Sequence, residues 1–158
     1  MTVVRRAAAC AAALVAVPAL ASCSVLGSDE PEGSVFAIEP GDCFLAPDEV
    51  KAQISELEQV ECAQEHDHEA YAVVDWEPTD AESNADVFPG DDVLTSFADG
   101  ACAQEFGDYV GVDYLDSSLF FTYLLPSPRS WQEKDRSVVC FAVDSGRPLT
   151  GSVAGTKL

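Results

Sequence analysis

Two histidines set among acidic residues form the stretch of this chain best suited to chemistry. They are His66 and His68, in the run Glu65-His66-Asp67-His68-Glu69. Because alternate residues of a strand share a face, the two imidazoles could ligate one metal ion, aided by Glu65 or Asp67. Two ligands alone do not make a metal site, however. We favour the interpretation in which His66 closes a turn through a hydrogen bond and His68 is solvated among acids, and we predict no metal.

Other patterns of reactive side chains are weaker. The acidic stretch from Asp80 to Asp91 spaces oxygen ligands like a calcium loop, but Ala85 stands where the sharp turn needs glycine, and no glutamate ends the pattern. A solvated acidic loop is the simpler interpretation. Gly151 to Gly155 has the wrong spacing for a nucleophile elbow, and acids are too abundant to single out a glycosidase pair. We therefore predict that the protein is not an enzyme.

A tryptophan near two arginines is unusual in so acidic a chain. Trp131 lies close in sequence to Arg129 and Arg136, and such a cluster could anchor a partner. More often the tryptophan covers the core while a nearby acid, here Asp135, satisfies the arginine, and we prefer that interpretation. The candidate binding residues are therefore His66, Asp67, Trp131 and Arg136.

Four cysteines lie in the part of the chain predicted to fold. An even number in an exported domain indicates disulfide bonds, and four cysteines allow three connectivities. We favour Cys43–Cys62 and Cys102–Cys140, because each pair would tie neighbouring elements together. A four-cysteine metal site is disfavoured, because no C-x-x-C pair occurs.

The start of the chain predicts export and lipid attachment. A basic start precedes an apolar run that suits a signal peptide and is short for a membrane span of roughly 20 residues. Leu20-Ala21-Ser22-Cys23 then resembles a bacterial lipobox. We predict a lipoprotein signal peptide at residues 1–22, a lipidated Cys23 followed by a flexible tether at 23–34, and a location on the outer face of the cytoplasmic membrane. An ordinary secretory signal cut elsewhere is the alternative.

Acidic residues dominate the composition and narrow the range of partners. The chain has 8 Lys and Arg against 28 Asp and Glu, for a formal net charge of −20. Such a charge disfavours nucleic acid and anionic lipid headgroups as partners. It suits solubility at a charged envelope, and it would also attract cations or a basic patch on a protein.

The elements that must position these residues form one domain over residues 35–158. A helix is predicted to start at Asp91, with an acidic residue at its cap and in its first turn, and to stop between Gly107 and Gly111. Its apolar stripe and the adjoining row are Leu94, Ala98, Cys102, Phe106, Val93, Phe97 and Ala101.

Strands are predicted at 35–45, 68–76, 119–125 and 136–144, the third of them buried, with a short edge element at 149–153. Pro40-Gly41 signals a turn within the first. Residues 48–57 favour either a short helix or an extended segment continuing to Cys62. The fold class is therefore α+β, with a small antiparallel sheet packed against one main helix and two disulfides.

Several separated pieces of this domain resemble the septum formation domain family of high-GC Gram-positive bacteria. The resemblance runs from about Pro40 to Gly155. Its pieces are Gly41-Asp42-Cys43-Phe44, Cys62 with His66-Asp67, Ala70-Tyr71-Ala72-Val73, Phe88-Pro89-Gly90, Cys102 with Phe106, Tyr109-Val110-Gly111, Leu125-Pro126-Ser127, Ser130-Trp131, Asp135-Arg136, Val139-Cys140-Phe141 and Thr150-Gly151-Ser152.

The resemblance implies a membrane-anchored protein with its domain outside and a role in forming the division septum. It implies no catalytic residue and no ligand. Glu65 stands where the family tends to have proline, and Lys134 where glycine is common, so a turn could differ at each place.

We therefore predict a lipid-anchored, non-enzymatic interaction module at the cell envelope, linked to septum formation. Its partners would be the lipid bilayer, through acylated Cys23, and an envelope or division protein. No cofactor and no nucleic acid partner are predicted. The alternatives are an envelope hydrolase and a cation-binding module, either of which would use His66 and nearby acids.

Overall fold

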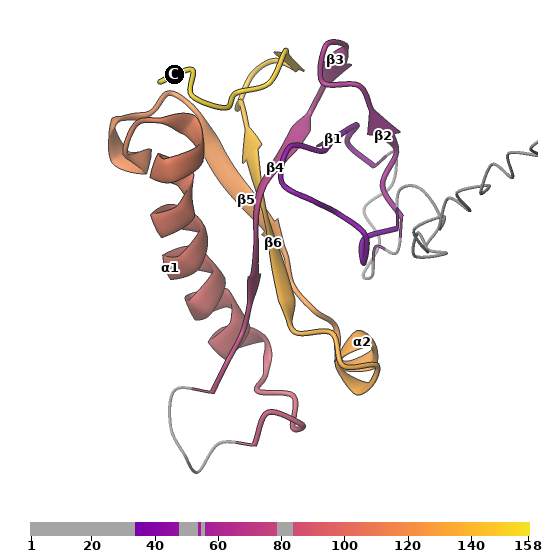
Figure 1. Cartoon of the computed structure of the whole chain (residues 1–158). Coiled ribbons are helices and arrows are strands. Elements are labelled where there is room, and N and C mark those ends of the chain that lie inside the picture. The colour runs from indigo at the N-terminus through magenta and orange to yellow at the C-terminus, as the bar shows by residue number, and fades with distance from the viewer. Residues whose placement is uncertain (1–33, 48–53, 55, 79–83) are drawn as a thin grey trace, which may run out of the picture.

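Two antiparallel strands, β4 (His68–Asp75) and β6 (Ser137–Val143), form the centre of the domain (Figure 1). The computed structural model of the chain describes residues 34–47, 54, 56–78 and 84–158. The main sheet has the order β2-β1-β4-β6-β5, which adds β1 (Cys43–Phe44), β2 (Gln59–Val60) and β5 (Phe120–Leu124). All of its pairings are antiparallel, as predicted.

A bulge in β4 decides which of its side chains face the helix. The register with β6 shifts between Ala70 and Ala72. A bulge sets two residues against one of the partner strand, and here Tyr71 and Ala72 both enter the core cluster under the helix. Ala70 lies in the cluster on the opposite face of the sheet. The strand predicted over 68–76 is confirmed, but simple alternation does not predict this bulge.

The helix α1 (Asp91–Val110) covers one face of the sheet (Figure 1). The predicted stripe is confirmed, because Leu94, Ala98, Cys102 and Phe106 are all buried. Val93, predicted in the adjoining row, is instead 46% exposed. Apolar side chains at this spacing make one continuous face, so burying that face supplies most of the stability of the helix.

The two ends of α1 rest on glycines. The predicted stop is confirmed, since Gly111 caps the helix in the left-handed conformation with φ of 87°. The predicted acidic cap is wrong, because the N-cap is Gly90, with φ of 98° and no side-chain cap. Only glycine adopts that conformation without strain. Asp91 and Asp92 lie in the first turn, where they face the positive end of the helix dipole.

β5 is an edge strand of the described sheet, which ends there. Leu119 is buried, but Phe120 is 47% exposed. The prediction of a buried strand at 119–125 is therefore wrong, because Phe120 and Thr122 are exposed and the other residues of β5 are only partly buried at this edge of the described sheet. The 3-10 helix η1 (Tyr114–Asp116) precedes it.

A short helix, α2 (Pro128–Gln132), lies between β5 and β6 and carries the buried Trp131. Ser127 and Ser130 cap its start reciprocally, which satisfies two backbone donors that the helix leaves open. Pro128 at the first position suits the helix, since its ring fixes φ and it lacks an N–H.

Both disulfides are the ones favoured from the sequence. Cys43–Cys62 joins β1 to the chain just after β2, and Cys102–Cys140 joins α1 to β6. A second, two-stranded sheet pairs β3 (Glu65–His66) with β7 (Leu149–Thr150), which confirms an edge element near 149–153.

Several predicted features lie outside the described residues. They include the signal peptide, Cys23 and nearly all of the tether. Most of 48–57 also lies outside, while Ile54, Glu56 and Leu57 are not helical and Glu56 forms a β-bridge with Ser34.

Pro40 and Gly41 make the predicted turn. None of the described helices is long and apolar enough to cross a membrane.

Candidate functional site

A glutamate carboxylate near the start of β4 is sealed from solvent. Glu69 on β4 is 0% exposed. Tyr109 Oη and Ser152 Oγ donate to its Oε1 at 2.7 and 2.6 Å, and the Val153 N–H donates to Oε2 at 2.8 Å. A buried carboxylate is tolerated when its lone pairs are occupied in this way. Because the donors come from α1 and from the C-terminal segment, one side chain ties three parts of the chain together.

His66 is the second member of this buried cluster and is also 0% exposed. Its Nδ1 lies 2.9 Å from the Gln64 carbonyl oxygen, in agreement with the predicted local hydrogen bond. Its Nε2 lies 3.7 Å from Glu69 Oε2 and has no hydrogen-bond partner among the described residues. When Nδ1–H donates to the carbonyl, attraction between Nε2 and the carboxylate needs a proton or another cation at Nε2.

Strand pairings and one turn place these side chains. β1 pairs with β4 so that Cys43 lies opposite Glu69. β3 pairs with β7 and so carries His66 beside the C-terminal segment. Gly151, with φ of 81°, then turns the chain and brings Ser152 onto the carboxylate. Only glycine adopts this backbone conformation readily, so the turn depends on it.

Sequence reasoning found His66 but missed Glu69, Tyr109 and Ser152 as site residues. One signal was present, because Glu69 stands two residues before Tyr71 on a strand predicted to be half-buried. An acid on the inward face of such a strand needs hydrogen-bond donors.

The structure separates His68 from His66. The His68 ring packs edge-on against Phe141, with ring centroids 5.8 Å apart. The one group of described residues able to hold a metal contains Cys43, His66 and Glu69, and His68 is not in it. His68 is half-buried rather than solvated among acids, because it packs on an aromatic ring of the core.

His68→Phe is expected to make the domain less sensitive to acid. Burial lowers the pKa of His68 below its ordinary value of 6.5, while the Asp67 carboxylate opposes that shift. The unfolded chain therefore takes up this proton more readily than the folded one, so His68 lowers stability as pH falls below about 6.5. Denaturant unfolding near pH 7 and near pH 5 should show that the free energy of unfolding drops more for the wild type than for the variant between the two pH values. Equal losses would contradict the prediction.

Asp67 has a structural task. Its carboxylate accepts a hydrogen bond from the Ala46 N–H at 2.7 Å, and its own N–H donates to the Phe44 carbonyl. It therefore holds the chain that leaves β1 against the turn between β3 and β4.

Trp131 and Arg136 pack against each other in the core-covering manner that we preferred. Trp131 is 2% exposed, and the Arg136 guanidinium lies 3.8 Å from the centre of its ring. The arginine donates to the carbonyls of Ala85, Trp131 and Asp135, so backbone oxygens take the place of the expected carboxylate. Arg129 is exposed and makes none of these contacts.

Most of the calcium-like pattern lies outside the described residues. Of its later members, Asp86 accepts a hydrogen bond from Lys134 at 2.6 Å, which lowers the pKa of the Asp86 carboxyl. Both side chains are exposed, so this pair adds little stability.

Tyr109→Phe is expected to destabilise the domain by about 1.5–3 kcal/mol, because a hydrogen bond to a charged group is lost. Burial, then the hydrogen bond to Glu69, raises the pKa of Tyr109 from 10.0 to about 12. The folded chain keeps this proton longer than the unfolded one, so wild-type stability falls as pH rises between those two values. In denaturant unfolding over this pH range, the free energy of unfolding of the variant should fall less steeply than that of the wild type.

Tyr123→Phe is the matched control for the free energy of unfolding of Tyr109→Phe. Tyr123 Oη donates to Asp99 at the surface, so its loss should change the free energy of unfolding by at most about 0.5 kcal/mol. Equal destabilisation of the two variants would argue against a special role for Tyr109.

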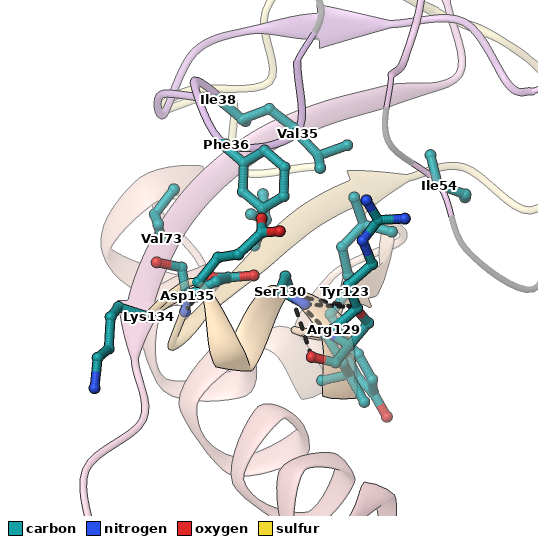
Figure 2. A pocket seen from close by; sticks show the side chains of 16 residues that line it. Val35, Phe36, Ile38, Ile54, Val73, Tyr123, Arg129, Ser130, Lys134 and Asp135 are labelled. Carbon is teal, nitrogen blue, oxygen red and sulfur yellow. Dashed lines mark hydrogen bonds between the residues drawn. The ribbon is translucent and has the colours of Figure 1, made fainter. Parts of the chain in front are cut away.

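A groove opens on the sheet face opposite α1 (Figure 2). Its volume is about 1000 Å³, and its floor includes Val73 of β4, Leu124 of β5 and Val139 of β6. Residues 35–38 form one side, and α2 with the following turn forms the other. Phe36 is 54% and Val73 38% exposed, so apolar surface is open to solvent here.

Charged side chains line the α2 side of the groove. Lys134 is paired with Asp86, as described above. Arg129 and Glu133 are exposed, and neither side chain forms an ion pair or hydrogen bond with a described residue. The groove thus combines an apolar floor with charges that a partner could use.

Fold and site together define a class: a small, disulfide-bonded α+β domain with a sealed acid–imidazole cluster and an open groove. The chain belongs to the septum formation family, whose model, described as Septum formation, matches residues 40–156. This confirms the resemblance seen in the sequence and links the protein to septum formation. No curated protein and no solved structure matches the chain.

Proposed function

We propose that this protein is a lipid-anchored, non-enzymatic interaction module on the outer face of the cytoplasmic membrane, which binds an envelope or division protein in septum formation. The observation that carries the proposal is the groove opposite α1, where apolar side chains are open to solvent. Exposed apolar surface of this kind marks interaction sites on small domains.

Burial of the histidine–glutamate pair argues against the hydrolase alternative. His66 and Glu69 are both 0% exposed, so a substrate could reach neither unless the core opened. A general acid or base must come within hydrogen-bond reach of its substrate. The paired side chains instead join strands to the C-terminal segment, which is a structural task.

The proposed occupant of the groove is a protein segment with apolar side chains flanked by lysine or arginine. The apolar part matches the floor at Val73, Leu124 and Val139. The basic part matches the net charge of −20, which attracts cationic partners and speeds their encounter. The volume of about 1000 Å³ is at the upper end for small-molecule pockets, which favours a peptide segment.

The test is crosslinking on living cells with substitutions in the groove. Val73→Arg and Phe36→Arg would each place a repelling charge in it, and we expect loss of the crosslinked partner. Leu115→Arg is the control, because Leu115 is 87% exposed on η1 and outside the groove. Thermal melting should show all three variants folded. Partner capture unchanged in both groove variants, or recovery of a lipid or a second copy of this chain, would overturn the proposed occupant.

The proposed anchor has its own test. Cys23→Ala removes the only thiol of the lipobox, so the variant should move from the membrane fraction to the soluble or secreted fraction. Two acyl chains hold a protein far more firmly than one, so the shift should be nearly complete. A variant still held in the membrane fraction would remove the anchor from the proposal.

A further inference from the structure

We infer that the reduced protein holds one zinc ion between Cys43, His66 and Glu69, in a site that the Cys43–Cys62 disulfide closes. One ligand atom from each of the three residues lies within 4.8 Å of the other two. Their exposed fractions are 1%, 0% and 0%. Zinc bonds to sulfur, nitrogen and oxygen are about 2.0–2.3 Å long, so one ion could bridge these atoms after small side-chain movements.

The hydrogen bonds of His66 are those of a metal-ligating histidine. Such residues donate one ring N–H to a backbone carbonyl, which leaves the lone pair of the other nitrogen for the metal. In this chain Nδ1 lies 2.9 Å from the Gln64 carbonyl oxygen. The buried Nε2 has no hydrogen-bond partner in the described part of the chain and faces Glu69 Oε2 at 3.7 Å. A cation between that nitrogen and that oxygen would satisfy both.

Glu69 is held in place in the same manner. Hydrogen bonds from Tyr109, Ser152 and the Val153 N–H fix its carboxylate from the side of the helix and the C-terminal segment. Metal-binding carboxylates are oriented by outer hydrogen bonds of this kind. The carboxylate therefore needs no further support to act as a ligand.

The thiolate ligand exists only after reduction. In the oxidised protein the Cys43 sulfur is bonded to Cys62 and carries no thiolate. An external dithiol can deliver two electrons and two protons to that bond, giving two thiols and becoming a disulfide itself. A zinc ion then displaces both thiol protons to solvent, because thiolates are the ligating form. Cys62, bonded to Cys43 before reduction, supplies the fourth ligand of a tetrahedral site.

Oxidation of Cys43 and Cys62 to the disulfide and binding of zinc are then mutually exclusive states of one site. Before the disulfide forms, zinc would join the two cysteines that the disulfide later bonds to His66 of β3 and Glu69 of β4. The donor set of two sulfurs, one nitrogen and one oxygen suits zinc better than calcium or magnesium, which prefer oxygen ligands alone.

The experiment compares zinc binding by the oxidised full chain and by the chain reduced with a phosphine under anaerobic conditions. Native mass spectrometry after zinc chloride addition should show one zinc on the reduced chain and none on the oxidised chain. His66→Ala should weaken zinc binding by at least about 100-fold. His68→Ala should not, since that residue lies outside the cluster.

Two further measurements distinguish zinc at this site from zinc held by the remaining thiols or by His68. Cys102→Ala with Cys140→Ala removes the two thiols that reduction would free from the other described disulfide, and zinc binding should persist. In the reduced wild type, zinc should shift the imidazole nitrogen resonances of His66 and leave those of His68 in place, which needs no variant to fold. No zinc on the reduced wild type, equal binding by His66→Ala, or unshifted His66 resonances would overturn the inference.

Discussion

Replacing Glu69 with alanine is expected to lower the free energy of unfolding by about 3–5 kcal/mol, because three hydrogen-bond donors lose their buried acceptor and each costs about 1–3 kcal/mol when left unpaired. The side chain is 0% exposed and accepts from Tyr109, Ser152 and the Val153 N–H. Each of these donors would lose its partner, and each loss carries a desolvation penalty. His66 would also lose the carboxylate that faces Nε2.

Denaturant unfolding near neutral pH measures this effect. Glu65→Ala is the matched control, since it removes the same charge from an exposed position on β3, and a change within about 0.5 kcal/mol is expected. Glu69→Gln keeps the shape but turns one acceptor into a donor, so its cost should be intermediate. A Glu69→Ala variant as stable as the wild type would contradict the assignment of Glu69 as the buried junction.

Removing the Cys102–Cys140 disulfide is expected to cost about 4 kcal/mol from chain entropy, given a sequence separation of 38. Both residues are 0% exposed, so alanine at each position also leaves a cavity and adds to the loss. The bond joins α1 to the central strand β6, and without it the helix is held by packing and by hydrogen bonds such as that of Tyr109 to Glu69.

The other disulfide supplies the comparison. Cys43–Cys62 has a sequence separation of 19, for which the same relation gives about 3 kcal/mol. Paired alanine substitutions at each bridge, followed by thermal and denaturant unfolding, should rank the 102–140 variant as the less stable. The reverse order would show that β1 and its neighbours, rather than α1, depend more on covalent support.

The main helix and the two central strands were predictable because their signals are local. Leu94, Ala98, Cys102 and Phe106 recur at helical spacing, and all four are buried. The sequences of β4 and β6 favour strands because both contain β-branched and aromatic residues. The glycine that ends the helix has a local cause as well, because Gly111 alone relieves the strain of a left-handed cap.

Burial and junctions were less predictable, because they depend on residues far apart in sequence. The hydrogen bond from Ser152 to Glu69 spans 83 positions. The exposure of Phe120 follows from the position of β5 at the sheet edge, which no local pattern reveals. His66 looked like one of a histidine pair, yet the turn at Asp67 sends His68 to the opposite side, against Phe141.

The sequence by itself determined the fold class, the extent of α1 and of the central strands, and the family, which the family model confirms over residues 40–156. It also pointed to the observed cysteine pairing, although other connectivities stayed open until the fold was known. Only the tertiary structure decided that Glu69 joins three parts of the chain, that His66 faces it, and that a groove opens opposite α1. The physical reason is range: periodicity and backbone strain act within a few residues, whereas burial and hydrogen-bond partnership depend on what the folded chain brings from elsewhere.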